Sequence, residues 1–258
     1  MRRLLPALAL AVLAGCARAP VERVEWTTMG TIAAVQTRGA ADPSAVETVK
    51  RSFENLEALL NAHNPESELS RLAPLPEGEI LTMCDKAMRP CYETAFRLMR
   101  ETDGAFNPRW RGPDKLDLGG IAKGFALDLA EAELRNGNKP LESGDVLLDL
   151  GGNIKICSGE WKVGIYAPED AGAMETISLT SGCACATSAE YARGKHIYDG
   201  RTGLAVSNDL VSVTVVHPTS AMLADGLSTI MFIFGREEGE VFLKEHYPEA
   251  KAIWQVRR

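Results

Sequence analysis

Two oxygen-bearing side chains near the end of the sequence have the spacing of a small metal site. Asp225 and Thr229 lie four residues apart in residues 221–234, a stretch that is otherwise mostly apolar. On a helix, residues four apart share one face, so both side chains would direct their oxygens to one place. A carboxylate, a hydroxyl and a main-chain carbonyl suit Mg²⁺ better than zinc. The alternative is that Asp225 caps the helix N-terminus while Thr229 lies in the core.

A glycine pair stands where a third helical pattern begins. Residues 117–124 read Asp-Leu-Gly-Gly-Ile-Ala-Lys-Gly. Backbone N–H groups at such a junction can approach a phosphate, the helix dipole favours its negative charge, and Lys123 is near enough to add a positive one. Tight helix packing accounts for the same glycines equally well. A second glycine pair, in residues 149–153, follows a strand and is typical of a turn at a strand end.

A short polar loop contains one of the four histidines of the chain. His196 lies within residues 194–203, a cluster that also holds a carboxylate and two cationic side chains between two probable turns. Because an imidazole can take up a proton near neutral pH, this loop is a candidate for a general base. A surface turn is the alternative, and the residues of the loop do not decide between the two.

The elements that must position these residues follow from hydrophobic periodicity. Helical spacing of apolar residues predicts helices over residues 44–62, 84–101, 121–135 and 221–234, the last ending at Gly235. Short apolar runs predict strands over residues 146–150, 161–166 and 210–216, and a strand pair over residues 24–36 that is broken at Met29 and Gly30. Helices interleaved with strands of mixed length indicate an α+β fold rather than a regular βαβ series.

Composition and charge narrow the class of protein further. The chain has 258 residues and a net charge of −7 without a basic stripe, so nucleic acid is not expected among its partners. Its length favours one domain with a substantial core. Beyond Cys16 there are five cysteines, whose spacing matches no standard zinc pattern and favours buried thiols: Cys84, Cys91, Cys157, Cys183 and Cys185.

The first residues have the pattern of an export signal. Arg2 and Arg3 supply the positive region, residues 4–14 form an apolar stretch too short to span a bilayer stably, and Leu-Ala-Gly precedes Cys16. That ending resembles a bacterial lipobox, which implies that residues 1–15 are removed and that Cys16 carries lipid. An ordinary cleaved signal with an incidental cysteine is the alternative. No later segment offers about 20 uninterrupted apolar residues, so acyl chains would be the membrane attachment.

Taken together, the motifs resemble a known family. They are residues 29–31, 103–106, 117–124, 149–153, 186–188, 196–203 and 224–229. In this order they are similar to the motifs of the ApbE family of FAD:protein FMN transferases, across nearly the whole mature chain. The resemblance implies a single α+β domain over residues 16–258, with mixed sheets and packed helices in two intimate lobes. Many members are bacterial lipoproteins, which agrees with a protein anchored through Cys16 at the periplasmic face of a membrane.

The resemblance also implies an activity. Members cleave the pyrophosphate of FAD with Mg²⁺, release AMP and esterify FMN to a Thr or Ser hydroxyl of an acceptor flavoprotein, respiratory subunits among them, within the pattern Asp-x-x-Ser/Thr-Gly-Ala-Ser/Thr. By similarity, Asp225, Thr229 and the carbonyl of Gly120 hold the metal, and His196 and Asp225 are catalytic. The implied flavin-nucleotide contacts are Met29, His63, Ala105, Phe106, Asn107, Asp117, Lys123 and Tyr198. Hydrolysis of FAD to FMN and AMP, and flavin binding without catalysis, are the alternative activities.

The chain departs from the family pattern at several positions. Asn107 stands where members usually have Asp, Ala189 where they have Gly, and Gly200 where they have Pro. Residues 107–116 also form a shorter connection than members usually carry near the flavin. These departures bear on flavin affinity and acceptor docking more than on metal binding.

Overall fold

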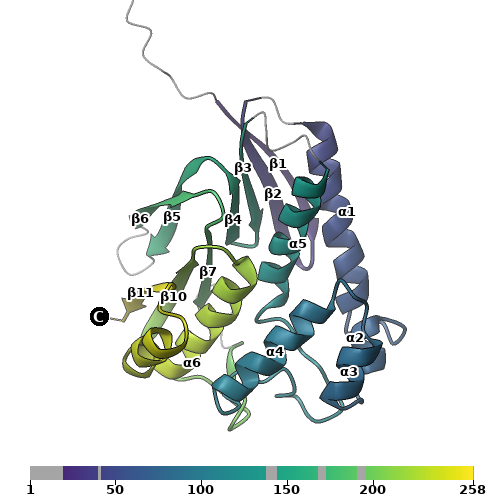
Figure 1. The fold of residues 1–258 in the computed structure, drawn as a ribbon. Coiled ribbons are helices and arrows are strands. Elements are labelled where there is room, and N and C mark those ends of the chain that lie inside the picture. Colours follow the sequence, from purple (N-terminus) through teal and green to yellow (C-terminus); the bar gives the residue numbers. More distant parts are fainter. Residues whose placement is uncertain (1–19, 40–41, 138–143, 168–172, 191–195, 258) are drawn as a thin grey trace, which may run out of the picture.

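A computed structural model gives the fold of residues 20–39, 42–137, 144–167, 173–190 and 196–257 (Figure 1). The predicted signal, residues 1–15, and the predicted lipidation site Cys16 lie outside these described ranges. Within them, no helix combines the length and apolar character needed to cross a membrane.

The centre of the fold is a seven-stranded sheet in the order β1-β2-β3-β4-β7-β10-β11, with antiparallel pairing at each step. Its strands are β1 (Val21–Thr28), β2 (Thr31–Arg38), β3 (Asp145–Leu150), β4 (Asn153–Ser158), β7 (Ala184–Ala189), β10 (Leu210–His217) and β11 (Lys251–Val256). Two small antiparallel sheets complete the described strands: β5 (Glu160–Ala167) with β6 (Ala173–Thr180), and β8 (Tyr198–Asp199) with β9 (Leu204–Ala205).

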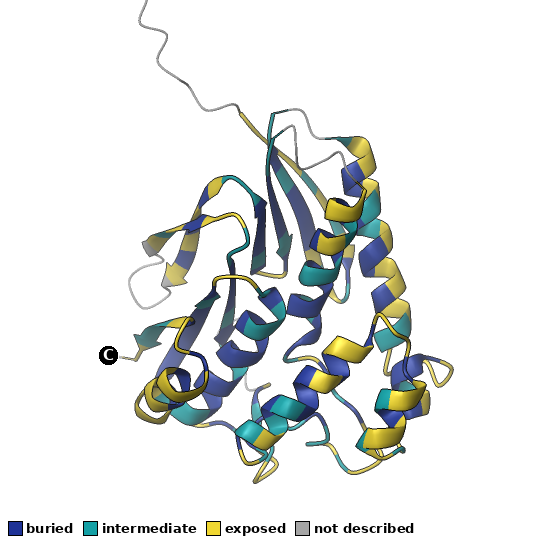
Figure 2. Cartoon of the chain, viewed as in Figure 1, coloured by how far each residue is buried: buried dark blue, intermediate teal, exposed yellow. Residues whose placement is uncertain are grey.

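The described helices are α1 (Pro43–Leu60), α2 (Glu68–Leu72), α3 (Glu77–Met83), α4 (Arg89–Glu101), α5 (Ala122–Asn136) and α6 (Ala221–His246). Of these, α1, α5 and α6 cover one face of the sheet. Figure 1 shows α1, α5 and α6 against the sheet, and their inward faces are buried in Figure 2. Successive side chains of β3 point to opposite faces of the sheet. Leu148 therefore packs in the main core, whereas Leu147 packs on the other face in a second apolar cluster with Trp161 of β5. The strand β3 therefore contacts apolar side chains on both faces of the sheet.

The predicted elements agree with this fold in most places. The single α+β domain is confirmed, as are the helices now seen as α1 and α5 and the strand pair broken at Met29 and Gly30. The helical stretch expected over residues 84–101 is confirmed from Arg89 onwards, where α4 begins with a proline in its first turn, whereas Cys84 follows the end of α3. Gly235 does break α6, with φ 75°, but a helical path resumes beyond it.

The described cysteines are free thiols. Cys84, Cys91, Cys157 and Cys185 are buried and Cys183 is partly buried, as the sequence indicated. Burial raises the pKa of the Cys185 thiol to about 12, even though this residue borders the cavity described below. A thiol with so high a pKa is protonated near neutral pH and is a poor nucleophile.

Candidate active site

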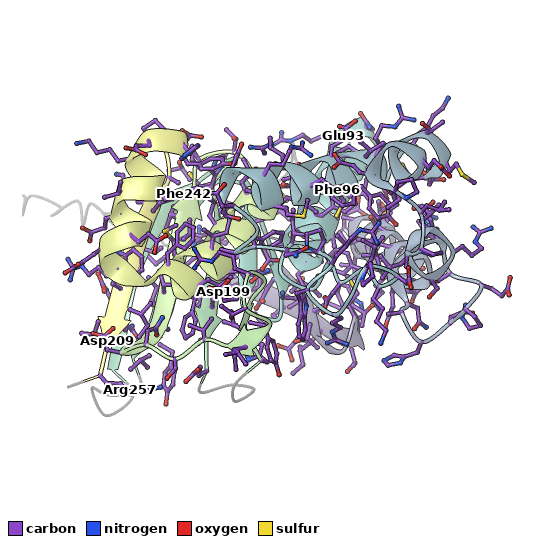
Figure 3. All side chains as sticks on the ribbon, turned by 90° about the horizontal axis from the view of Figure 1, so that it is seen from below. Glu93, Phe96, Asp199, Asp209, Phe242 and Arg257 are labelled. Atoms are coloured by element: carbon purple, nitrogen blue, oxygen red, sulfur yellow. The ribbon has the colours of Figure 1, made fainter. Side chains whose placement is uncertain are left out.

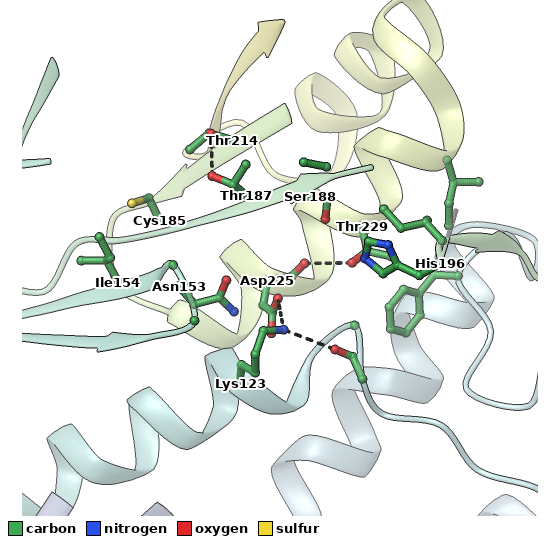
Figure 4. Close-up of a pocket in the computed structure, with 18 of the residues that line it drawn as sticks. Lys123, Asn153, Ile154, Cys185, Thr187, Ser188, His196, Thr214, Asp225 and Thr229 are labelled. Carbon is green, nitrogen blue, oxygen red and sulfur yellow. Dashed lines mark hydrogen bonds and ion pairs between the residues drawn. The ribbon is translucent and has the colours of Figure 1, made fainter. Parts of the chain in front are cut away.

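A cavity of about 750 Å³ lies where α5, α6, the ends of β4 and β7, the β5 strand and residues 105–111 meet. Many of the predicted site residues line it, although they come from segments far apart in the sequence. These residues are Ala105, Phe106, Asn107, Asp117, Gly120, Lys123, His196, Tyr198, Asp225 and Thr229. Figure 4 shows Lys123 and Asp225 at the centre, with Ile154 and Cys185 on one side and His196 on the other.

Two predicted flavin contacts do not reach this cavity. Met29 is in the turn between β1 and β2 with a positive φ of 49°, and its partly buried side chain packs against the main core. His63 is exposed in the loop after α1, where its backbone N–H donates to the side chain of Asn61. The structure therefore places both residues outside the described site.

Asp225 is held by the N-terminus of a neighbouring helix rather than that of its own. The N-cap of α6 is Ser220, so Asp225 lies one turn inside, where it is only 4% exposed. Its Oδ2 accepts the backbone N–H of Gly124 at 2.9 Å, and its Oδ1 is 3.4 Å from Nζ of Lys123. The first turn of α5 has no side-chain cap of its own. The Asp225 carboxylate is thus the anion that binds at the N-terminus of α5.

Asp128 of α5 makes the reciprocal contact. Its carboxylate accepts the Ser220 hydroxyl at 2.8 Å and the N–H groups of Ala221 and Met222 at 2.8 and 3.0 Å, which caps α6. Lys155 of β4, only 1% exposed, is 3.1 Å from Asp128. Burial opposes the charge on Lys155, but the carboxylates around it outweigh that effect and raise its pKa. Each helix therefore fixes the N-terminus of the other, and Asp225 and Lys123 are held together.

The two helices approach each other most closely at Gly124. A Cβ on this glycine would lie 2.1 Å from the carbonyl oxygen of Ala221, far inside van der Waals contact. The last glycine of the 117–124 motif is therefore required for helix packing. Tight helix packing therefore explains this glycine of the motif. The close crossing of α5 and α6 also serves the site, because it sets the distance between Lys123 and Asp225.

Thr229 brings a further oxygen beside Asp225, and the main chain at Gly120 lies close to Thr229. The Thr229 hydroxyl donates to the carbonyl of Asp225 at 3.3 Å, which leaves its lone pairs available. A Cβ on Gly120 would lie 3.2 Å from that hydroxyl oxygen and 3.1 Å from the Phe106 ring, so the main chain runs close to Thr229. No group of three or more His, Cys, Asp and Glu side chains in the described ranges could hold a metal. The donors near Asp225 are carboxylate, hydroxyl and backbone oxygen, which fits a hard cation that completes its shell with phosphate and water.

His196 lines the cavity from the loop before β8. The side chain is exposed, and Figure 4 shows its ring beside Thr229, across from Asn153. An imidazole at the open side of the cavity can meet a hydroxyl that enters from solvent. The position therefore agrees with the general-base role that the motif implies.

The short connection of residues 107–116 is firmly tied to the fold. The guanidinium of Arg109 donates to the carbonyl of Ala73 at 2.6 Å and also to those of Leu75 and Pro113. The backbone N–H of Asp117 donates to the carbonyl of Pro108 at 2.8 Å. These bonds turn the segment so that Trp110 and Arg111 line the cavity. No hydrophobic periodicity in this segment predicts that position.

Two of the departures from the family pattern touch each other. A Cβ on Gly200 would lie 2.3 Å from Cβ of Asn107 and 2.4 Å from the carbonyl oxygen of Gly104. The backbone N–H of Gly200 also donates to the carbonyl of Ala105 at 2.9 Å. Proline, which is usual at this position in the family, has no backbone N–H to donate, and its side chain would clash with these atoms. The glycine thus joins the loop of His196 to the segment that carries Phe106.

Gly200→Pro is expected to destabilise the protein by about 3 kcal/mol or more, because the change removes a hydrogen bond and forces a backbone clash. Thermal unfolding measures this. Gly203→Ala is a matched control in the same loop, with nothing within 4 Å of its added Cβ but a φ of 69°, so it should cost only the smaller backbone strain of roughly 1–2 kcal/mol. Equal stability of Gly200→Pro and the unaltered protein would contradict the close contact.

Asn153 is a cavity residue that was not among the predicted site residues. Only 2% of it is exposed, and its Nδ2 has no hydrogen-bond partner among the described residues. Figure 4 shows the side chain turned towards Asp225 and Lys123. The preceding turn is as expected, with Gly151 and Gly152 at φ 63° and 88°. A buried donor without an acceptor is costly, so Asn153 is suited to bind a ligand oxygen.

Comparisons with known proteins agree with this architecture. The ApbE family model matches residues 29–114 and 109–254. The FAD:protein FMN transferase of Vibrio cholerae is 29% identical over 93% of this chain and 90% of its own, and that of Haemophilus influenzae is 26% identical over 90% and 86%.

Solved structures show the same fold. The flavin transferase ApbE from Vibrio cholerae superimposes with a TM-score of 0.74 at 22% identity, over 93% of this chain and 95% of the other. The ApbE protein from Thermotoga maritima superimposes with a TM-score of 0.76 at 21% identity, over 92% and 94%. Because the family model spans nearly all of the described residues, the chain belongs to the ApbE family.

Proposed function

We propose that this protein transfers FMN from FAD to a Ser or Thr hydroxyl of an acceptor protein, releases AMP and requires Mg²⁺. The observation that carries the proposal is the cavity in which the oxygens of Asp225 and Thr229, the cation of Lys123 and the imidazole of His196 converge. The curated relatives are FAD:protein FMN transferases and align over most of their own length, which supports the same activity here.

The reaction moves one phosphoryl group. The acceptor hydroxyl oxygen bonds to the phosphorus of the FMN half of FAD, and the bond from that phosphorus to the bridging oxygen breaks. AMP leaves with the bridging oxygen, and the hydroxyl proton passes to His196. Such a transfer depends mainly on positioning and on neutralising negative charge. Lys123 and the donor group of Asn153 supply positive potential at the centre of the cavity.

The cation would be held by the side chains of Asp225 and Thr229 and by the carbonyl of Gly120. Their chemistry fits Mg²⁺, because all three are hard oxygen donors and too few to fill its shell without substrate phosphates and water. When bound, the ion supplies neutralisation of the pyrophosphate charge. Lys123, at 3.4 Å from Asp225, keeps that carboxylate paired in the protein itself.

Three activities remain to be separated by their products. FAD and Mg²⁺ are incubated with an acceptor that carries the family's Asp-x-x-Ser/Thr-Gly-Ala-Ser/Thr pattern, and AMP, free FMN and protein-bound flavin are quantified by chromatography. The proposal predicts AMP and protein-bound FMN in equal amounts. AMP with free FMN would indicate hydrolysis, and retention of unchanged FAD would indicate a flavin-binding protein without catalysis.

His196→Ala is expected to reduce transfer to protein by about a hundredfold or more, because general-base catalysis typically contributes that much. Hydrolysis of FAD should fall less, because water needs less help in docking than a protein hydroxyl does. The ratio of protein-bound to free FMN measures the difference. An unchanged ratio would show that His196 does not act on the acceptor.

We also propose that the mature protein begins at Cys16 and is held by acyl chains at the periplasmic face of a membrane. The lipobox pattern before Cys16 supports this. Cys16→Ser is expected to move the protein from the membrane fraction to the soluble fraction of the envelope and to abolish labelling with a radioactive fatty acid. Continued labelling of the variant would contradict the assignment.

A further inference from the structure

The turn that leads into α6 is held by polar side chains that lie outside the cavity lining. His217, at the end of β10, is 3% exposed, and its Nδ1 accepts the backbone N–H of Ser220 at 3.0 Å. Nζ of Lys155 on β4 donates to the carbonyl of Thr219 at 2.6 Å. Asp128 of α5 accepts the Ser220 hydroxyl and the first two N–H groups of α6. The proposed chemistry uses none of these three side chains, although burial of charged groups is costly.

Lys155 is at the centre of this network. Its Nζ lies 3.1 Å from Asp128 and 3.0 Å from Glu131. Together with the carbonyl of Thr219, these partners match the three donors of an ammonium group. Lysine is almost never buried so completely unless it is paired. Because both carboxylates lie on α5 and the carbonyl immediately precedes the N-cap of α6, Lys155 ties the two helices to one strand.

The same strand also reaches the cavity. Asn153 is two residues before Lys155, so the two side chains extend from the same face of β4. Further along, α6 packs against β7 and β10, and Figure 3 shows its C-terminal part, marked by Phe242, in the same helix layer as Phe96 of α4. Relative to Asn153, the first turn of α6 is therefore placed by Lys155 and Asp128.

The proposed metal ligands belong to two different elements. Asp225 and Thr229 are on α6, whereas Gly120 lies in the segment that leads into α5. The fit of these oxygens around one ion therefore depends on how α6 is placed relative to α5. Groups that hold metal ligands in position typically change metal affinity by about ten- to a hundredfold, because ligands already in place need not be reorganised.

We propose that Asp128 and Lys155 are positioning residues for the metal site. By fixing the N-terminus of α6 against α5 and β4, they set the affinity of the protein for Mg²⁺ without touching the ion or the nucleotide. The inference rests on the proposed function for the identity of the site. A merely structural role would lower the folded fraction and leave the metal affinity of the folded protein unchanged.

Binding of Mn²⁺, a paramagnetic substitute for Mg²⁺, to the whole protein without nucleotide tests the inference by electron paramagnetic resonance of the free ion. Asp128→Asn keeps the size of the side chain and one acceptor oxygen but loses the charge opposite Lys155. Its Kd for Mn²⁺ should rise by about ten- to a hundredfold. Glu133→Gln, loss of a carboxylate from the same helix outside the network, is the matched control and should bind Mn²⁺ normally. An unchanged Kd in folded Asp128→Asn would overturn the inference.

A double-mutant cycle tests whether the two residues act together. Lys155→Gln removes the charge, but its carboxamide can still donate to the carbonyl of Thr219. If Lys155 acts through Asp128, the variant with both changes should bind Mn²⁺ no worse than the weaker of the two single variants. Additive losses would show that the residues act separately and would overturn their shared role. Thermal unfolding of each variant checks that it is folded.

The Mg²⁺ dependence of AMP release separates this inference from the proposed function. Asp128→Asn should need about ten- to a hundredfold more Mg²⁺ for half the maximal rate yet approach the same maximum, because the ligands themselves remain. An active transferase whose folded Asp128→Asn variant keeps the ordinary Mg²⁺ requirement would overturn the positioning role and leave the activity intact.

Two further outcomes are distinct. A protein whose Asp128→Asn variant binds Mn²⁺ more weakly, but which forms no protein-bound flavin, would contradict the transferase activity and not the positioning role. If the unaltered protein bound no Mn²⁺, the metal site and the positioning role would both be wrong.

Discussion

Asp225→Ala is expected to lower both FMN transfer and FAD hydrolysis by on the order of a thousandfold, as for loss of a main electrostatic group in an active site. The change removes the one carboxylate in the proposed metal set. It also leaves Nζ of Lys123 and the N–H of Gly124 without their partner. Initial rates of AMP release, measured with and without acceptor at several Mg²⁺ concentrations, test the prediction.

Asp225→Asn is the control for folding. Its carboxamide oxygen can still accept the Gly124 N–H, so the helix contact persists while the negative charge is lost. This variant should melt near the unaltered protein yet remain inactive at any Mg²⁺ concentration. Full activity in either variant would rule out Asp225 as a metal ligand, whereas activity restored by high Mg²⁺ would point to a supporting role.

Gly124→Ala is expected to destabilise the protein by about 3 kcal/mol or more, a larger effect than that of Gly203→Ala or Gly137→Ala. The added Cβ would lie 2.1 Å from the Ala221 carbonyl oxygen, so α5 and α6 would have to separate. Separation would also move Lys123 from Asp225 and lower activity in the fraction that stays folded. Chemical denaturation measures the free energy of unfolding.

Gly137→Ala provides the comparison for that result. Gly137 is exposed at the C-terminus of the same helix, has a φ of −76°, and its added Cβ would meet only ordinary contacts at 3.5 Å. Alanine should therefore be neutral there or stabilising by about 0.4–1 kcal/mol through reduced freedom of the unfolded chain. Equal losses of stability at both positions would contradict the close helix crossing at Gly124.

Much of the site could be predicted because it depends on local spacing. Asp225 and Thr229 share a helix face by periodicity alone, and the helix that begins after Gly120 follows from the glycine pair and the apolar pattern. The order of the motifs along the chain, through its resemblance to the ApbE family, adds His196 and Tyr198 to the predicted site. The structure brings all of them to one cavity.

The remainder depends on contacts between distant segments, which periodicity does not encode. Trp110 lies in a loop without a pattern, and its ring stacks on that of Tyr198, 88 positions later in the sequence. The contact between Asn107 and Gly200 is equally non-local. Helix capping by Asp225 is one reading of the sequence, but in the structure this carboxylate binds the N-terminus of α5 and not that of its own helix. Such reciprocal contacts follow from how helices cross in the folded protein.

The most direct test of the central claim is in-gel flavin fluorescence of the acceptor after incubation with this protein, FAD and Mg²⁺, with the intact mass of the acceptor determined on the same sample. We expect a fluorescent acceptor band that survives denaturing electrophoresis and a mass gain of one FMN phosphoester. An acceptor variant with alanine at the modified Ser or Thr should give neither. FAD consumption without any gain in acceptor mass would contradict the transferase function.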